Sequence, residues 1–245
     1  MPAGTAIGVV GKDGASATGL REGTVIGLGG HDHVCGAFAA GVTQHGAVLD
    51  SMGTAEALFV ALDAPIWDQD FGRAGYTQGA HVVAGKYYGF GGLYTSGAAI
   101  DWIRSITGRE DRMALSGEAG SVPPGSNGVT FLPHLRLGGP PNIDGRSRGA
   151  FLGLTTDIDQ GALVRAVYEG LAYVAILGRT TGCLCRFQSA PRLHGDRRQR
   201  RATTCSCGDQ GFGDQSTASC GWPSMKPPRW GSALLGGLAA GTYSP

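Results

Sequence analysis

The pattern of hydrophobic and polar positions divides the chain near Ile176. Before that residue, Val and Ile are frequent and several segments show clear helical or strand periods. After it there is no Val, Ile or Glu, and residues 178–230 are rich in Arg, Cys, Ser, Gln and Pro. Such a composition buries too little apolar surface to offset the entropy of ordering the chain. We therefore expect residues 178–230 to be an aberrant, disordered segment.

Short apolar runs in the first part of the chain predict β-strands. Residues 24–28 form a β-type run that ends in two glycines, as expected of a strand that meets a turn. Residues 47–51 and 81–83 are further strand candidates. These strands, mixed with helical segments, predict an α/β fold.

Two segments with helical periodicity accompany these strands. Residues 97–106 carry Ile at every third position with Trp102 beside them, which fits an amphipathic helix. Residues 160–177 form the clearest helix, with Asp159 as a plausible N-cap and Gly178 as a plausible C′ residue. One face of that helix is apolar and comprises Leu163, Val167, Leu171 and Val174. Ordinary sequence resumes at residues 231–241, which read as a helix of small residues.

Composition narrows the class of protein. The chain has 245 residues, a net charge of +1 and 44 glycines, so no bulk field directs it to nucleic acid or to a membrane surface. The chain has no apolar run of the roughly 20 residues that cross a bilayer. Its first residues lack the basic and apolar regions of a signal peptide. We expect a cytoplasmic protein that binds neither nucleic acid nor membrane, and we leave a homodimer open as its assembly.

The segment Gly29-Gly30-His31-Asp32-His33 is the most suggestive local feature. Glycines after a strand let a ligand approach the backbone, and an acid at such a turn can accept a proton from a substrate hydroxyl. The alternative is a turn Asp that bonds nearby backbone N–H groups. A metal site is disfavoured because alternate residues of an extended chain face opposite ways, and we assign no metal ligand.

One turn and the start of one helix could bind phosphate. Gly53-Thr54 follows the strand that ends at Ser51, and a turn of this kind can offer N–H groups and a hydroxyl. Gly97-Ala98-Ala99 opens a helix without bulky side chains, and a helix N-terminus favours anions. The alternatives are an ordinary turn and a helix that packs closely against its neighbour.

Taken in order, these segments resemble the FGGY carbohydrate kinases. The resemblance covers roughly residues 15–177 and 231–244 and is that of a C-terminal lobe. Five passages carry it, namely Gly19 through His33, Asp50-Ser51-Met52-Gly53-Thr54-Ala55, Gly97 through Arg104, Phe131 through Leu154, and Arg165-Ala166-Val167-Tyr168-Glu169-Gly170-Leu171-Ala172. Any one passage is weak, but the ordered set is specific.

The resemblance implies a fold and a chemistry. The fold is an actin-like ATPase, ribonuclease-H-like α/β lobe, and the reaction is phosphoryl transfer from ATP, with Mg²⁺, to a hydroxyl of a sugar or polyol. Asp32 is implied as the general base, with His33 beside it at the substrate. Gly53, Thr54 and Gly97 are implied along the nucleotide, and Asp101 stands where glycerol kinases have a nucleotide-contacting Gln. The predicted organisation is residues 1–23 as the end of an N-terminal lobe, 24–177 as the kinase lobe and 231–245 as its terminal helix.

The chain departs from this family in three respects. Residues 136–141 replace a Gly-Glu-Arg-x-Pro element, and the N-terminal lobe of the family, with its Asp-x-Gly-Thr loop, has no counterpart here. The Gly-rich adenine loop expected after residue 177 is also missing. Residues 225–231 can be encoded so that a shift of one base reads Glu-Ala-Thr-Ala-Leu-Gly, which is the family motif, so we favour a reading-frame slip over a real insertion.

The cysteine-rich segment leaves other hypotheses open. Of six cysteines, five lie at Cys183, Cys185, Cys205, Cys207 and Cys220. Zinc is disfavoured because structural sites usually separate paired ligands by two to four residues. The Arg-rich run at residues 197–201 could bind RNA or phosphate. Three functions follow, namely a sugar kinase present as a C-terminal fragment, a non-catalytic fragment and, less favoured, a Cys/Arg-rich binding module.

Overall fold

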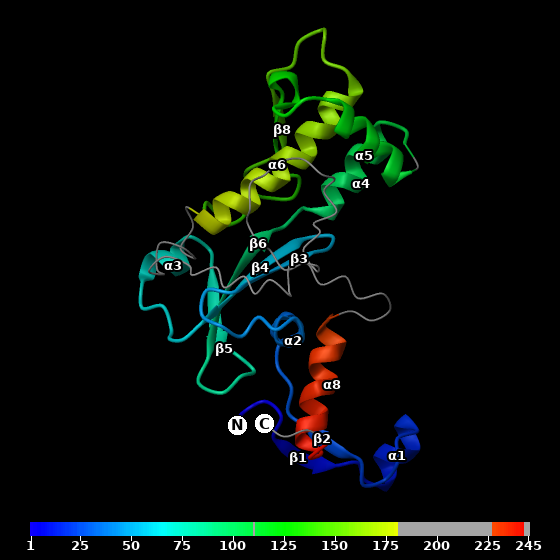
Figure 1. Cartoon of the computed structure of the whole chain (residues 1–245), viewed down its shortest axis with the longest axis vertical. Coiled ribbons are helices and arrows are strands. Elements are labelled where there is room, and N and C mark those ends of the chain that lie inside the picture. The colour runs from blue at the N-terminus through cyan, green and yellow to red at the C-terminus, as the bar shows by residue number, and fades with distance from the viewer. Residues whose placement is uncertain (110, 181–226, 243–245) are drawn as a thin grey trace, which may run out of the picture.

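A four-stranded antiparallel sheet in the order β3-β4-β6-β5 forms the centre of the fold (Figure 1). The computed structural model describes residues 1–109, 111–180 and 227–242. The strands are β3 Val48–Met52, β4 Glu56–Leu62, β5 Thr77–Ala80 and β6 Tyr87–Leu93. A hairpin turn at residues 53–55 joins β3 to β4, and this turn contains two of the residues predicted to bind the nucleotide.

Strand β4 is buried on both faces, which explains why all of its residues after Glu56 are apolar. Phe59 and Ala61 pack into a core shared with helix α2, Asp32–Ala39. Leu58 and Val60 point to the opposite face and pack near helix α3, Gln69–Arg73. The sheet therefore separates two apolar cores, and α2 is held against one of them.

Three helices form a second region, next to the end of β6 (Figure 1). They are α4 Gly97–Ile106, α5 Arg112–Ser121 and α6 Gln160–Thr180, and they enclose a core with the strands β7 Thr130–Leu132 and β8 Ala150–Leu152. Trp102 of α4 stacks on Phe131 and Phe151 with ring centroids 5.9 and 6.3 Å apart. This aromatic contact docks α4 on the β7–β8 pair.

A buried ion pair ties α6 to the loop between α5 and β7. Arg165 Nε lies 2.7 Å from Glu169 Oε1, and both residues are buried. The loop includes the short 3₁₀ helix η1, Ser126–Gly128. Arg165 also donates to the carbonyl oxygens of Ala119 and Val122. Glu169 also accepts hydrogen bonds from the Gly125 amide and the Ser126 hydroxyl. The Arg-Ala-x-x-Glu-Gly passage at residues 165–170 therefore has a structural role, and we call the bonded Arg165–Glu169 pair the clamp on α6.

The last helix, α8 Pro227–Ala239, packs against α2 and β2 (Figure 1). Strand β2, Val25–Gly27, pairs antiparallel with β1, Ala6–Val9, and the two flank helix α1, Lys12–Thr18. The predicted boundary at residue 23 therefore lies between two strands of one small sheet. A side chain at Gly231 would overlap the carbonyl oxygen of Cys35 in α2, so the two helices approach closely.

Replacing Gly231 by Ala should destabilise the fold. The added methyl meets backbone rather than a movable side chain, and overpacking of this kind costs roughly 1–3 kcal/mol. The same change at Gly236 meets no atom within 4 Å and should be neutral or stabilising, since Ala is the better helix former. Urea unfolding of both variants measures the difference. Equal stabilities would contradict the contact between α8 and α2.

The structure confirms several predicted elements. The strands expected at 24–28 and 47–51 are β2 and β3, and the helix expected at 97–106 is α4 with the same bounds. Asp159 caps α6 through a 2.8 Å bond from the Ala162 amide. The helix expected from residue 231 is present as α8 but begins earlier, at Pro227.

Two predictions about local structure are wrong. Residues 81–83 are not a strand but belong to the turn between β5 and β6, closed by a bond from the His81 amide to the Lys86 carbonyl. The turn buries Val82, which accounts for its apolar sequence. Gly178 does not end α6, because the helix continues to Thr180.

Most of the segment predicted to be aberrant lies outside the described residues. Residues 178–180 belong to α6 and residues 227–230 to α8. Residues 181–226, which contain five of the cysteines and the Arg-rich run, are not among the described residues. The frame-slip, zinc and RNA hypotheses therefore stay predictions.

Candidate functional site

The turn at residues 53–55 and the start of α4 form one hydrogen-bonded junction. The Gly53 carbonyl accepts the Gly97 amide at 2.9 Å. The Thr54 carbonyl accepts the amides of Ser96 and Ala98 at 3.1 and 3.2 Å. Three residues predicted from the sequence, Gly53, Thr54 and Gly97, are therefore brought together by segments some forty positions apart. We call this feature the hairpin–α4 junction.

Gly97 serves this junction by its lack of a side chain. A Cβ at residue 97 would lie 2.5 Å from the Gly53 carbonyl oxygen, so only glycine permits the close approach. The amides of Gly97 and Ala98 donate to the turn, so the helix terminus does not present them to a phosphate as the sequence suggested. The Thr54 hydroxyl and the backbone of the turn are the groups that the junction offers to a ligand.

Asp101 lies one helical turn beyond Gly97 on α4. Its Oδ1 is 3.5 Å from Arg104 Nη2, and both side chains are partly exposed. A carboxylate at this position is held by a cation on its own helix. Asp101 therefore lies on the same face of α4 as Gly97.

The structure adds two site residues that the sequence analysis did not find, Glu56 and Ser96. The Ser96 hydroxyl donates to Glu56 Oε2 at 2.8 Å, and the two residues are 5% and 0% exposed. Met52 pairs with Glu56 and Asp50 with Leu58, so Asp50 is a diagonal neighbour of Glu56 on one face of the sheet. Burial and the nearby Asp50 raise the pKa of Glu56 from 4.5 to about 7, although the Ser96 bond opposes this.

The raised pKa of Glu56 predicts how stability changes with pH. The folded state binds the Glu56 proton more tightly than the unfolded state, so protonation of Glu56 stabilises the fold. This contribution to the free energy of unfolding is complete below pH 4.5 and is lost as pH rises through about 7. The loss is on the order of 3 kcal/mol. Glu56→Gln should remove this dependence and make the protein more stable than the parent at pH 8.

Urea unfolding between pH 4.5 and 8 measures this difference. Glu22→Gln is the matched control, because Glu22 is exposed in a turn that is distant from Glu56 in the sequence. The control should keep the pH dependence of the parent. A parent and a Glu56→Gln variant with parallel pH profiles would show that Glu56 does not titrate in this range.

Asp32 is the first residue of α2 and its carboxylate is exposed. Asp32 Oδ1 accepts the amide of His33 at 2.8 Å and lies 3.1 Å from His31 Nδ1. The side chain is 66% exposed, so it can meet a substrate from solvent. The turn interpretation and the base interpretation are compatible here, because the turn engages Oδ1 and the rest of the carboxylate faces outward.

Aromatic contacts hold this acid in place. The rings of His31 and His33 stack at 5.6 Å and both contact Phe90 of β6, with centroids 6.0 and 5.5 Å away. Gly30 has a structural role, because a Cβ there would lie 2.5 Å from Val82 Cγ1. Only Gly29 of the glycine pair has open space beside it. The histidines therefore anchor the start of α2 to the central sheet.

The predicted site residues thus fall into two groups. Asp32 and His33 begin α2, while Gly53, Thr54, Gly97 and Asp101 belong to the hairpin–α4 junction. Both groups are attached to the same four-stranded sheet, the first through Phe90 of β6 and the second through β3 and β4.

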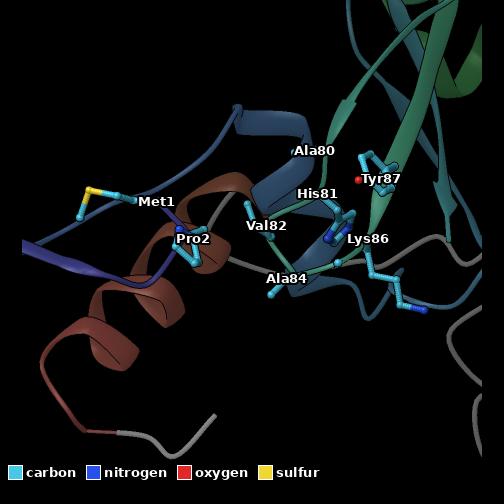
Figure 2. A pocket seen from close by; sticks show the side chains of 10 residues that line it. Met1, Pro2, Ala80, His81, Val82, Ala84, Lys86 and Tyr87 are labelled. Atoms are coloured by element: carbon cyan, nitrogen blue, oxygen red, sulfur yellow. The ribbon is translucent and has the colours of Figure 1, made fainter. Parts of the chain in front are cut away.

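A cavity of about 250 Å³ lies elsewhere, between the first residues of the chain and the β5–β6 turn (Figure 2). Its lining includes Met1, Pro2, His81 and Lys86, and none of the predicted site residues. Burial lowers the pKa of His81, which favours its neutral form. This cavity is separate from the candidate site.

Two general properties of the described residues bear on function. No helix among them combines the length and the apolar character that a membrane span needs. The same residues contain no group of three or more His, Cys, Asp or Glu side chains that could hold a metal ion. Mg²⁺ commonly binds through one or two carboxylates together with substrate phosphates, a mode that needs no such group.

Comparison with known proteins identifies the family. The model of the FGGY family of carbohydrate kinases, C-terminal domain, matches residues 48–179. The chain belongs to the FGGY family of carbohydrate kinases. The matched range contains the hairpin–α4 junction and all of α5, and it begins after Asp32. The assignment of Asp32 therefore depends on the sequence passage around it.

Individual family members agree with this assignment. Xylulose kinase from Bacillus subtilis (strain 168) is 29% identical over 161 residues, which are 65% of this chain and 32% of that protein. The structure of xylulose kinase from Rhodospirillum rubrum matches with a TM-score of 0.61 and 31% identity, covering 72% of this chain and 36% of that one. The structure of a xylulose kinase from Brucella ovis covers 100% of this chain and 49% of its own, with a TM-score of 0.75 and 22% identity.

These comparisons fix the fold class and the extent of the match. The solved neighbours are FGGY sugar kinases, so the fold is the expected actin-like, ribonuclease-H-like α/β class. The chain spans about a third of the length of the curated relatives that it matches. The prediction that this is C-terminal kinase sequence is confirmed.

Proposed function

We propose that this chain is the C-terminal lobe of a kinase that transfers a phosphoryl group from ATP to a hydroxyl of a sugar or polyol. The observation that carries the proposal is the hairpin–α4 junction, which lies within the residues matched by the family model. Phosphoryl transfer relies mainly on positioning and on stabilising charge. A rigid junction that offers the Thr54 hydroxyl and a tight turn suits the positioning of phosphates.

Each predicted residue has a role in this proposal. Asp32 acts as the general base, and its exposed carboxylate takes the proton from the attacking hydroxyl. His33, held against Phe90, contacts the sugar beside it. Gly53, Thr54 and Gly97 form the edge along the nucleotide phosphates, and Asp101 contacts the nucleotide further along α4. Mg²⁺, bound with ATP, would neutralise charge on the phosphates.

The proposed acceptor is a ketose, with xylulose as the first candidate. Seven of the relatives compared are xylulose kinases, from Bacillus, Staphylococcus, Klebsiella, Lactococcus and Escherichia. A glycerol kinase from Synechocystis is 35% identical over 85 residues, which keeps polyols as the second candidate class. We further propose a cytoplasmic protein that acts on small molecules, binds no nucleic acid and forms a homodimer.

The 245 residues alone are proposed to be inactive. Donor, metal and acceptor must be held together in line, and this chain matches only about a third of its curated relatives. The alternative function is a non-catalytic fragment, which the same limited match supports. A Cys/Arg-rich binding module is less favoured, because such a module does not account for the family match at residues 48–179.

Thr54 provides the test of the nucleotide assignment. By the completed enzyme we mean this chain joined behind the N-terminal lobe of a xylulose kinase, with residues 181–226 replaced by the corresponding segment of that kinase. In the completed enzyme, Thr54→Val should raise the KM for ATP about tenfold, the equivalent of one lost hydrogen bond. The KM for the sugar should change by less than about twofold, because the hydroxyl is proposed to contact only the phosphates.

Thr77→Val is the matched control, since Thr77 is exposed on β5 and valine is well suited to a strand. Steady-state kinetics with ATP and sugar varied in turn should leave this control unchanged. If Thr54→Val changed only the KM for the sugar, the hairpin would not belong to the nucleotide site.

A further inference from the structure

The contact between Glu56 and Ser96 lies directly behind the hairpin–α4 junction. Glu56 is the first residue of β4, immediately after the turn that contains Thr54. Ser96 is the N-cap of α4 by position, yet its side chain caps no amide of the helix. Its hydroxyl instead donates to Glu56 Oε2 at 2.8 Å. The side chain that would ordinarily cap the helix thus links the helix to the strand.

This link is built at a considerable energetic cost. Burying a carboxyl group disfavours its charged form, and Asp50 on the neighbouring strand disfavours it further. An apolar residue at position 56 would suit the face that continues with Leu58 and Val60. The polar pair therefore sits where packing alone would select an aliphatic side chain, which indicates a task other than stability.

The neighbouring strands hold the main chain of Glu56 in place. A Cβ at Gly92 of β6 would overlap the Glu56 carbonyl oxygen, so β6 presses directly on this residue. The register pairs Glu56 with Leu93, three residues before Ser96. With its backbone fixed between β3 and β6, the Glu56 side chain acts as a strut toward the start of α4.

We propose that Glu56, acting through Ser96, is a positioning residue that holds the hairpin turn of Gly53 and Thr54 in register with α4. The inference rests on the proposed function in so far as that turn is taken to bind phosphates. Without the strut, three backbone bonds remain across the junction, two of them to the Thr54 carbonyl. The turn would then shift relative to α4, and the Thr54 hydroxyl would lose its fixed orientation.

Four variants of the full chain test this inference. Glu56→Ala and Ser96→Ala each remove one end of the strut, and the double variant removes both. Glu56→Gln keeps an acceptor oxygen for the Ser96 hydroxyl and should preserve it. Ser105→Ala, at an exposed position of the same helix, and Glu22→Gln are the matched controls. If the two side chains act as one unit, the double variant should be no worse than either single one.

Amide hydrogen exchange measures the junction itself. In Glu56→Ala and Ser96→Ala, the amides of Gly97 and Ala98 should exchange about tenfold faster. The hairpin–α4 junction opens more easily in these variants, because the hydrogen bond between Ser96 and Glu56 is lost. The amide of Val60 in the middle of β4 should keep its rate. Glu56→Gln and both controls should stay within about twofold of the parent. Equal acceleration at Val60 would reveal a general loss of stability and overturn the positioning role, as would unchanged rates at Gly97 and Ala98.

Titration of the same proteins with MgADP separates this inference from the proposed function. If the parent binds MgADP, the two alanine variants should bind about tenfold more weakly and Glu56→Gln about equally well. If the parent does not bind MgADP, nucleotide binding by this chain is refuted, while the exchange rates still decide whether Glu56 holds the turn. Alanine variants that bind like the parent despite faster exchange would overturn the link between the strut and the ligand.

Discussion

Asp32→Asn is expected to reduce the kcat of the completed enzyme by roughly 10²–10⁴-fold, the usual contribution of a general base. Asparagine keeps the shape of the residue, and its side-chain oxygen can still accept the His33 amide that Asp32 accepts at 2.8 Å. What it cannot do is take a proton from the attacking sugar hydroxyl. The KM values should change little, because the start of α2 remains anchored to Phe90 through His31 and His33.

The matched control is Asp157→Asn, since Asp157 is exposed in the loop before α6. Its kcat should equal that of the parent enzyme. Rates of product formation under saturating ATP and xylulose provide the measurement. Turnover of Asp32→Asn within a factor of about three of the parent would exclude Asp32 as the base, since even weak base catalysis exceeds that factor.

Glu169→Ala is expected to destabilise the chain by roughly 3–5 kcal/mol, the typical cost of breaking a buried ion pair. In the parent protein, the Glu169 carboxylate lies 2.7 Å from Arg165. The substitution removes this carboxylate and leaves the Arg165 charge buried. It also removes the acceptor for the Gly125 amide and the Ser126 hydroxyl. The loop that these bonds fix would come apart from α6, so much of the native population should be lost.

Glu118→Ala is the comparison that isolates burial. Glu118 also pairs with an arginine, at 2.6 Å from Arg109, but those side chains are 29% and 45% exposed. Surface pairs of this kind contribute about 0–1 kcal/mol. Urea unfolding monitored by circular dichroism should therefore separate the two variants clearly. Similar losses would mean that the clamp on α6 does not carry the stability assigned to it.

Local periodicity predicted some elements and misled at others. Residues 97–106 were predictable because regularly spaced Ile positions define one helical face, and Ile103 is indeed fully buried. Ile106 is 59% exposed, so the same spacing extends beyond the buried part of that face. Residues 81–83 are too few to show alternation, and a turn that buries Val82 has the same apolar sequence as a strand.

Tertiary context determined what the sequence analysis missed. Strand β4 lacks alternation because both of its faces are buried, a pattern that does not distinguish a strand from a buried helix segment. Glu56 and Ser96 are 40 positions apart, so no local pattern joins them. A lone charged residue at the start of an apolar run was the available signal for Glu56. Gly97 was found, and close packing of its helix was the alternative considered; the Gly53 carbonyl is the group against which it packs.

The most direct test of the proposed kinase function is the formation of sugar phosphate from ATP. The chain alone and the completed enzyme are each mixed with MgATP and xylulose, and the phosphorylated sugar is followed by mass spectrometry together with ADP release. The completed enzyme should turn over at roughly 1–100 s⁻¹, and the chain alone should form no product above the background of ATP hydrolysis. Turnover by the chain alone at that rate would contradict the need for a second lobe. A completed enzyme that binds MgATP but phosphorylates neither ketoses nor polyols would contradict the assignment of kinase function to this chain.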